Sequence, residues 1–146
     1  MNDSYLFIKG GKVDLVVGGA GVSETYGNRI VAVTGGQVNY GVFGGSNGNS
    51  GDGSNSRKGT LDGNTFVYIG GTATIGGGNS TGLFEVLPGN VFGAGNGNSS
   101  VSTIGSVENS RVLINGGTIQ GNVYGGGNYG AVGGSTSSDS VTTEEE

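Results

Sequence analysis

The chain has 146 residues, a length that suits one domain with a modest core, and 36 of those residues are glycine. A single proline and the lack of glycine at every third position exclude a collagen triple helix, and a charged fraction of 12% argues against charge-driven disorder. The net charge is −5 and the six Lys and Arg residues are scattered, so nucleic acid is not an expected partner. No apolar run reaches the roughly 18 residues of a membrane span.

Four short apolar runs recur along the chain, at residues 5–8, 30–33, 66–69 and 111–114. Their length, their Val, Ile, Phe and Tyr content and their Gly and Asn borders predict β-strands. A glycine pair follows each run, and an aliphatic residue stands two positions after the pair: Val13, Val38, Ala73 and Ile119. A second apolar pair ending in glycine comes next, at residues 16–18, 42–44, 91–93 and 123–125.

Each apolar run has one uniform face and one mixed face. The second and fourth residues are aliphatic in every run: Leu6 and Ile8, Val31 and Val33, Val67 and Ile69, Val112 and Ile114. The first and third positions are mixed and include four aromatic residues, Tyr5, Phe7, Phe66 and Tyr68. Because side chains alternate along a strand, we expect the aliphatic set to be buried and the mixed set to lie on the opposite face.

An Asp or Asn stands two residues before each run: Asp3, Asn28, Asn64 and Asn109. Such side chains bond nearby backbone groups and tolerate turn conformations. We therefore expect these residues to mark a corner that recurs in every repeat.

These patterns predict an all-β, glycine-rich β-solenoid, similar to a parallel β-helix, with about four irregular coils. Residues 1–138 form a single repeat domain, with units at about 3–27, 28–63, 64–108 and 109–138. Residues 139–146 are interpreted as the start of an incomplete further coil or as an acidic tail. A glycine-rich β-sandwich and an antiparallel meander are the structural alternatives.

The stretch GGTIQGNVYGGGNYG, with VFGAGNGN at 91–98 and VFGGSNGN at 42–49, resembles the glycine-rich repeats of large bacterial cell-surface or secreted proteins. Such repeats are regarded as adhesin-like and are predicted to be β-helical. The resemblance covers most of residues 5–136 and implies an extracellular, non-catalytic role at the bacterial surface, with no site residues. The insert NSTGLFEVLPG in the third unit departs from the pattern.

The sequence offers little for catalysis. Histidine and cysteine are absent, no helical segment follows the glycine-rich loops, and the acids do not recur as strand-borne pairs. We therefore predict no enzyme and no cofactor, and keep a carbohydrate-active or glycan-binding β-helix as an alternative. The loop at residues 46–55, which contains one acid, Asp52, leaves Ca²⁺ as the alternative to no cofactor.

Aromatic residues are the candidate contacts with a ligand or partner: Tyr5, Phe7, Phe66, Tyr68 and Tyr124. An exposed apolar stripe marks a binding or packing surface, and a host or glycan surface is one possible partner. In the other interpretation, Tyr124 stacks with Phe43 and Phe92 as an internal ladder, and a long loop covers Tyr5 and Phe66.

The predicted function is a non-catalytic structural or adhesive segment of a bacterial surface or secreted protein. An extracellular filament subunit that assembles head to tail is the alternative, because the exposed ends of a solenoid are unpaired strand edges. The expected partners are then neighbouring repeats or further copies of the chain itself.

Overall fold

The described part of the chain is built from β-strands. The computed structural model describes residues 3–21, 23–48, 59–77, 89–97 and 104–133, and within these ranges it has eleven strands and no helix. The strands are β1 (Ser4–Ile8), β2 (Lys12–Val17), β3 (Thr25–Tyr26), β4 (Arg29–Val33), β5 (Gln37–Phe43), β6 (Leu61–Ile69), β7 (Thr74–Ile75), β8 (Asn90–Phe92), β9 (Val107–Ile114), β10 (Thr118–Ile119) and β11 (Val123–Tyr124). The prediction of an all-β fold is confirmed.

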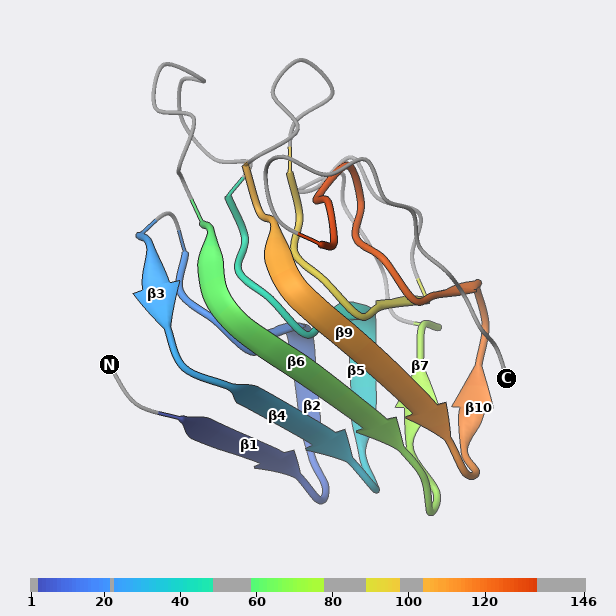
Figure 1. Cartoon of the computed structure of the whole chain (residues 1–146). Coiled ribbons are helices and arrows are strands. Elements are labelled where there is room, and N and C mark those ends of the chain that lie inside the picture. Colours follow the sequence, from blue (N-terminus) through green and yellow to red (C-terminus); the bar gives the residue numbers. More distant parts are fainter. Residues whose placement is uncertain (1–2, 22, 49–58, 78–88, 98–103, 134–146) are drawn as a thin grey trace.

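The strands form two sheets that lie in two layers (Figure 1). In the first sheet β1, β4, β6 and β9 lie side by side in chain order, and β3 also pairs with β6. In the second sheet β2 pairs with β5, and β5 pairs with both β7 and β8. In turn, β7 pairs with β10 and β8 pairs with β11. All pairings between these strands are parallel, so the alternative of an antiparallel meander is wrong.

The register of the first sheet aligns the four apolar runs position by position. Leu6 pairs with Val31, which pairs with Val67, and Val67 pairs with Val112. Equivalent residues of successive repeats therefore lie next to one another, and the predicted aliphatic face is the face that packs on the second sheet.

The core lies between the two sheets. Its fully buried members come from both sheets: Val31, Val33, Val38, Val42, Val67, Ile69, Ile75 and Val91. In the first and last repeats the equivalent residues are less buried, because each of these repeats has a described neighbour on one side only. Ile114, which belongs to the predicted buried set, is 40% exposed for this reason.

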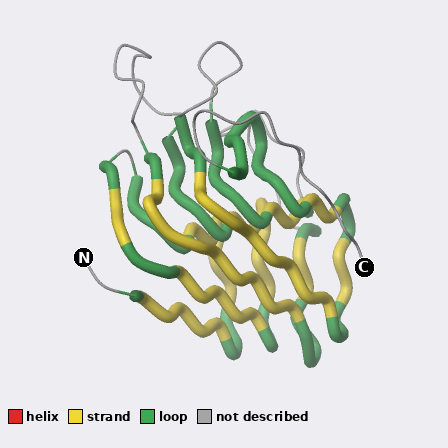
Figure 2. The backbone as a smooth tube through the Cα atoms, in the orientation of Figure 1, coloured by secondary structure: helices red, strands yellow, loops and turns green. Residues whose placement is uncertain are grey.

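The turns between the two sheets lie in a row along one edge of the molecule (Figure 2). Each contains a glycine with φ between +57° and +83°: Gly11, Gly36, Gly71 and Gly117. Residues with a Cβ adopt such angles at a cost, so the second member of each glycine pair follows from the turn geometry.

The third repeat differs from the others in its second-sheet strand. Its turn is longer, so that Ile75 pairs with Val38 and Ile119, and the prediction that Ala73 is the equivalent aliphatic is wrong. The strand is also interrupted after Ile75 and resumes at Asn90 in register with β5. Most of the predicted insert, residues 78–88, lies outside the described residues.

Glycine is also required where the second-sheet strands end, because the backbones of successive repeats come very close there. A Cβ at Gly44 would lie 2.3 Å from the carbonyl oxygen of Gly93 and 2.9 Å from Val67 Cγ2. A Cβ at Gly18 or Gly93 would meet the carbonyl of the following repeat at the same 2.3 Å. The recurring glycine after each second apolar pair therefore allows the repeats to stack.

Candidate functional site

Four of the five aromatic residues predicted to contact a partner lie together on the outer face of the first sheet. Tyr5 and Phe7 come from β1, and Phe66 and Tyr68 come from β6; we call these four residues the aromatic stripe. The register places Ile30 between Tyr5 and Phe66, and Ala32 between Phe7 and Tyr68. Arg111 and Leu113 of β9 extend the same two rows.

The stripe is open at its β1 end and more enclosed at β6. Tyr5 is 61% exposed and Phe7 is 58% exposed, whereas Phe66 and Tyr68 are partly buried. The rings of Tyr5 and Phe7 are 6.5 Å apart and nearly parallel. The Arg111 guanidinium carbon lies 5.6 Å from the Phe66 ring centroid, within the range of a cation–π contact.

A polar group also borders the stripe. The Asn115 side-chain amide donates a hydrogen bond of 3.0 Å to the Tyr68 hydroxyl. The surface thus combines flat apolar rings with a hydroxyl, an amide and a guanidinium, which suits a ligand that has both apolar faces and polar edges.

Tyr124, the fifth predicted contact residue, lies on the second sheet and is not part of the stripe. Its ring stacks on Phe92 at 5.0 Å, and Phe92 stacks on Phe43 at 4.7 Å. Phe43 and Phe92 are buried, but Tyr124 is 43% exposed because no described repeat follows it. The interpretation of these three residues as an aromatic ladder matches their placement.

The predicted corner residues form a continuous chain of hydrogen bonds across the four repeats. The Asn28 backbone N–H donates to Asp3 Oδ1, the Asn64 N–H and side-chain amide donate to Asn28 Oδ1, and the Asn109 amide donates to Asn64 Oδ1. All four residues are exposed. Their placement gives them a role in joining successive repeats.

A second ladder of asparagines was not predicted. The Asn96 side-chain amide donates to Asn47 Oδ1 at 2.9 Å, and the Asn128 amide donates to Asn96 Oδ1 at 2.8 Å. The sequence does carry a signal for it, because each of these asparagines stands five residues after the valine of a second apolar pair. Asn96 is buried, so this ladder joins the second, third and fourth repeats through hydrogen bonds that are shielded from solvent at Asn96.

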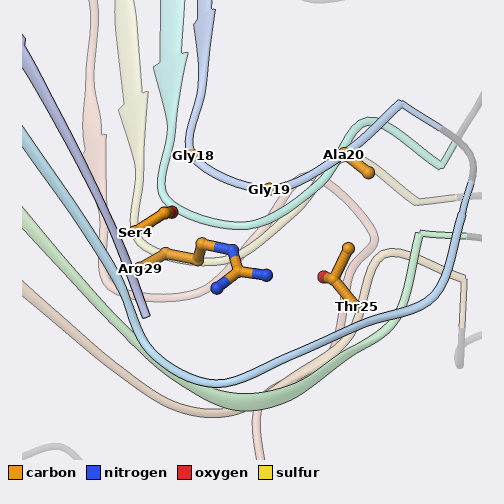
Figure 3. Close-up of a pocket in the computed structure, with 6 residues that line it drawn as sticks. All are labelled: Ser4, Gly18, Gly19, Ala20, Thr25 and Arg29. Carbon is orange, nitrogen blue, oxygen red and sulfur yellow. The ribbon is translucent and has the colours of Figure 1, made fainter. Parts of the chain in front are cut away.

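A small pocket also went unpredicted. It has a volume of about 230 Å³ and lies between the first and second repeats, lined by Ser4, Gly18, Gly19, Ala20, Thr25 and Arg29. Figure 3 shows the Arg29 side chain extending between the Gly18–Ala20 backbone and Thr25. Arg29 is 3% exposed, and its guanidinium donates to the Asn28 carbonyl oxygen at 3.1 Å.

Arg29, which lines the pocket, stands in a row of otherwise small residues. The register puts Arg29 next to Ser4 and Thr65, and Thr65 next to Ser110. Thr65 and Ser110 donate to the glycine carbonyls of Gly93 and Gly125, whereas the longer Arg29 side chain occupies this corner in the second repeat. The Thr25 hydroxyl beside it is buried and has no hydrogen-bond partner in the part of the chain that the structure describes, which suits an ordered water.

The described residues contain no group of three or more His, Cys, Asp or Glu side chains placed to hold a metal ion. Residues 49–58, which include Asp52 of the suggested Ca²⁺ loop, lie outside the described part of the chain. Within the described ranges there is also no helix long and apolar enough to cross a membrane.

The chain was compared with known proteins in three ways. No family model matches it, and no curated protein and no solved structure matches it either. The resemblance to glycine-rich adhesin-like repeats therefore stays a prediction.

Proposed function

We propose that this chain is a β-solenoid segment with a structural and adhesive role in a bacterial surface or secreted protein. In this proposal each repeat is one coil, which contributes one strand to the first sheet and one strand, divided in two in the third and fourth repeats, to the second. A coil buries its apolar face only against its neighbours, so an elongated stack of similar coils is its stable form.

The observation that carries the proposal is the stacking of like residues on like at three separate places. Asp3 and three asparagines form one ladder, Asn47, Asn96 and Asn128 form another, and Phe43, Phe92 and Tyr124 form the third. Each ladder joins successive repeats through side chains of one kind. In a β-sandwich, by contrast, nothing requires neighbouring strands to repeat the same residue at the same height.

The structural part of the proposal is tested by adding a coil. A second copy of residues 3–27, with Asn in place of Asp3, is inserted after residue 27. We expect a folded protein with increased β-sheet circular dichroism and a melting temperature at least equal to that of the parent, because each interface between coils adds stability. An insert of the same composition in scrambled order is the control, and a duplicated protein that unfolds like the scrambled one contradicts the solenoid.

The adhesive part rests on the aromatic stripe. Glycan-array and surface-binding assays compare the parent with Tyr5→Ala/Phe7→Ala and with Tyr129→Ala. Tyr129 is as exposed as Tyr5 but belongs to neither sheet. We expect the double variant to lose at least about tenfold in binding, in line with two exposed contacts of about 1 kcal/mol each, while Tyr129→Ala binds like the parent. Equal binding by all three proteins contradicts adhesion through the stripe.

A filament subunit is the second candidate, because the outermost strands at both ends of the stack have a strand partner on one side only within the described residues. The alternative of a carbohydrate-active β-helix is separated from glycan binding by product analysis. Release of shorter oligosaccharides from a bound polysaccharide would favour an enzyme.

A further inference from the structure

Among the described strands, those at the two ends of the stack have one unpaired edge each. At one end β1 and β2 pair only with β4 and β5, and at the other end β9, β10 and β11 pair only with β6, β7 and β8 among the described strands. We propose that the β9–β11 end of one copy receives the β1–β2 end of a second copy, in the register that joins the repeats inside the chain. The proposal rests on the structural role proposed above and names the partner of that role.

The hydrogen bonds that join Asp3, Asn28, Asn64 and Asn109 all run in one direction, and this direction favours the proposed orientation. In each step the later repeat donates to the side-chain oxygen of the earlier one, so the chain of bonds runs from Asn109 back to Asp3. A second copy stacked on the β9 end brings its Asp3 backbone N–H to Asn109 Oδ1 and continues the series. Two β1 ends placed together would reverse the direction of the series at the junction and could not continue it.

The side chains at the two ends also match. The internal register makes Tyr5 equivalent to Phe66 and to Arg111, so the Tyr5 of a second copy would lie on the open side of Arg111. The guanidinium, which already contacts the Phe66 ring, would then lie between two aromatic rings.

Apolar contacts follow the same register. Val17 is equivalent to Phe43 and hence to Tyr124, so the Val17 of a second copy would cover the exposed Tyr124 ring. Val123 and Ile114 at this end are 44% and 40% exposed, whereas their equivalents Val91 and Ile69 are fully buried. Burial of these apolar side chains is the driving force for association.

Substitution of either of two glycines by alanine would block the interface and leave the isolated monomer undisturbed. At Gly44 and Gly93 a Cβ would strike the carbonyl of the following repeat. At Gly125, the equivalent position of the last repeat, a Cβ meets no described residue within 4 Å. In the proposed stack it would strike the Gly18 carbonyl of the second copy. At the other end, a Cβ on Gly10 meets nothing within 4 Å in the described part of the chain, whereas a Cβ on the equivalent Gly35 would lie 2.3 Å from the Lys9 carbonyl oxygen.

The experiment measures the assembly of the full 146-residue chain by sedimentation velocity and electron microscopy over a range of concentrations. We expect the parent and the control Thr34→Ala, an exposed change in a middle repeat, to form rods whose length grows with concentration. Gly125→Ala and Gly10→Ala, each alone, are expected to stay monomeric, and to melt like the parent at concentrations low enough for the parent to be monomeric as well. An equimolar mixture of the two is expected to give dimers and nothing longer, because each variant retains one working end.

Three results overturn the proposal: a parent that is monomeric at every concentration, a parent that stops at a dimer, or glycine variants that assemble like the parent. Each leaves the structural role standing as long as the monomer keeps its β-sheet circular dichroism. Failure of the coil-duplication test, in contrast, counts against the structural role itself.

Discussion

At the scale of single residues, the glycines have at least two distinct roles. Gly11 and its equivalents adopt a positive φ in the turns, whereas Gly18, Gly44 and Gly93 make room for a neighbouring backbone. The sequence predicts the first role, because glycine pairs after short strands are typical of turns. It does not predict the second, since the close approach depends on how one repeat lies on the next.

The second role gives a prediction with a built-in control. Gly44→Ala places a methyl group 2.3 Å from the Gly93 carbonyl, so the two repeats must separate. We expect a loss of about 3 kcal/mol or more in the free energy of unfolding, the upper range for overpacking. Urea denaturation measures this loss, with Gly125→Ala as the control at the equivalent position in open space. Equal stability of the two variants would show that the repeats do not stack as described.

Residues with the same role in the sequence pattern also differ according to their place in the stack. Val67 is fully buried in a middle repeat, whereas Ile114 in the last repeat is 40% exposed. We expect Val67→Asp to unfold the protein, because a buried, unpaired carboxylate costs several kcal/mol, a large part of a typical domain's stability. Ile114→Asp is expected to cost about 1 kcal/mol.

Thermal melts monitored by circular dichroism compare these two variants, under dilute conditions in which the chain is monomeric. A melt of Val67→Asp that coincides with the parent's would contradict the position of the core. If Ile114→Asp unfolds the protein as completely as Val67→Asp does, then Ile114 is buried in solution, and the exposure described for the last repeat is wrong.

At the scale of strands and ladders, the repeat itself was predictable and its irregular parts were not. The four apolar runs, their two faces and the corner from Asp3 to Asn109 all follow from residues at fixed offsets. The burial of Arg29 could not be predicted, because in the sequence it is one of six scattered Lys and Arg residues with nothing to distinguish it. The structure places it in a row with Ser4 and Thr65, and its side chain is buried there and lines a pocket.

The two asparagine ladders differ in burial, and this difference sets their energetic weight. Asn96 is buried between Asn47 and Asn128, whereas Asn64 is exposed between Asn28 and Asn109. We expect Asn96→Ala to destabilise by about 2–3 kcal/mol, because its partners lose hydrogen bonds away from water, and Asn64→Ala by about 1 kcal/mol or less. Urea titrations of both variants measure the difference. A larger loss of unfolding free energy for Asn64→Ala than for Asn96→Ala would mean that the exposed ladder contributes more to stability than the buried one.

At the scale of the whole molecule, stability follows position along the stack. Among the described strands, each repeat pairs with its neighbours alone, and the first and last repeats have one neighbour each. Local opening is therefore expected to begin at the ends, as in other stacked architectures.

Hydrogen exchange tests this gradient and connects it to assembly. In dilute solution we expect the slowest amide exchange in β4 and β6 and faster exchange in β1, β10 and β11, because the end strands open without disturbing the middle. Raising the protein concentration is expected to slow exchange in β1 and β9–β11 and to leave β4 and β6 unchanged, since stacking of copies covers only the ends. Mass spectrometry of peptides from these strands measures both effects. Uniform protection along the stack would contradict the gradient, and end strands indifferent to concentration would contradict the junction between copies.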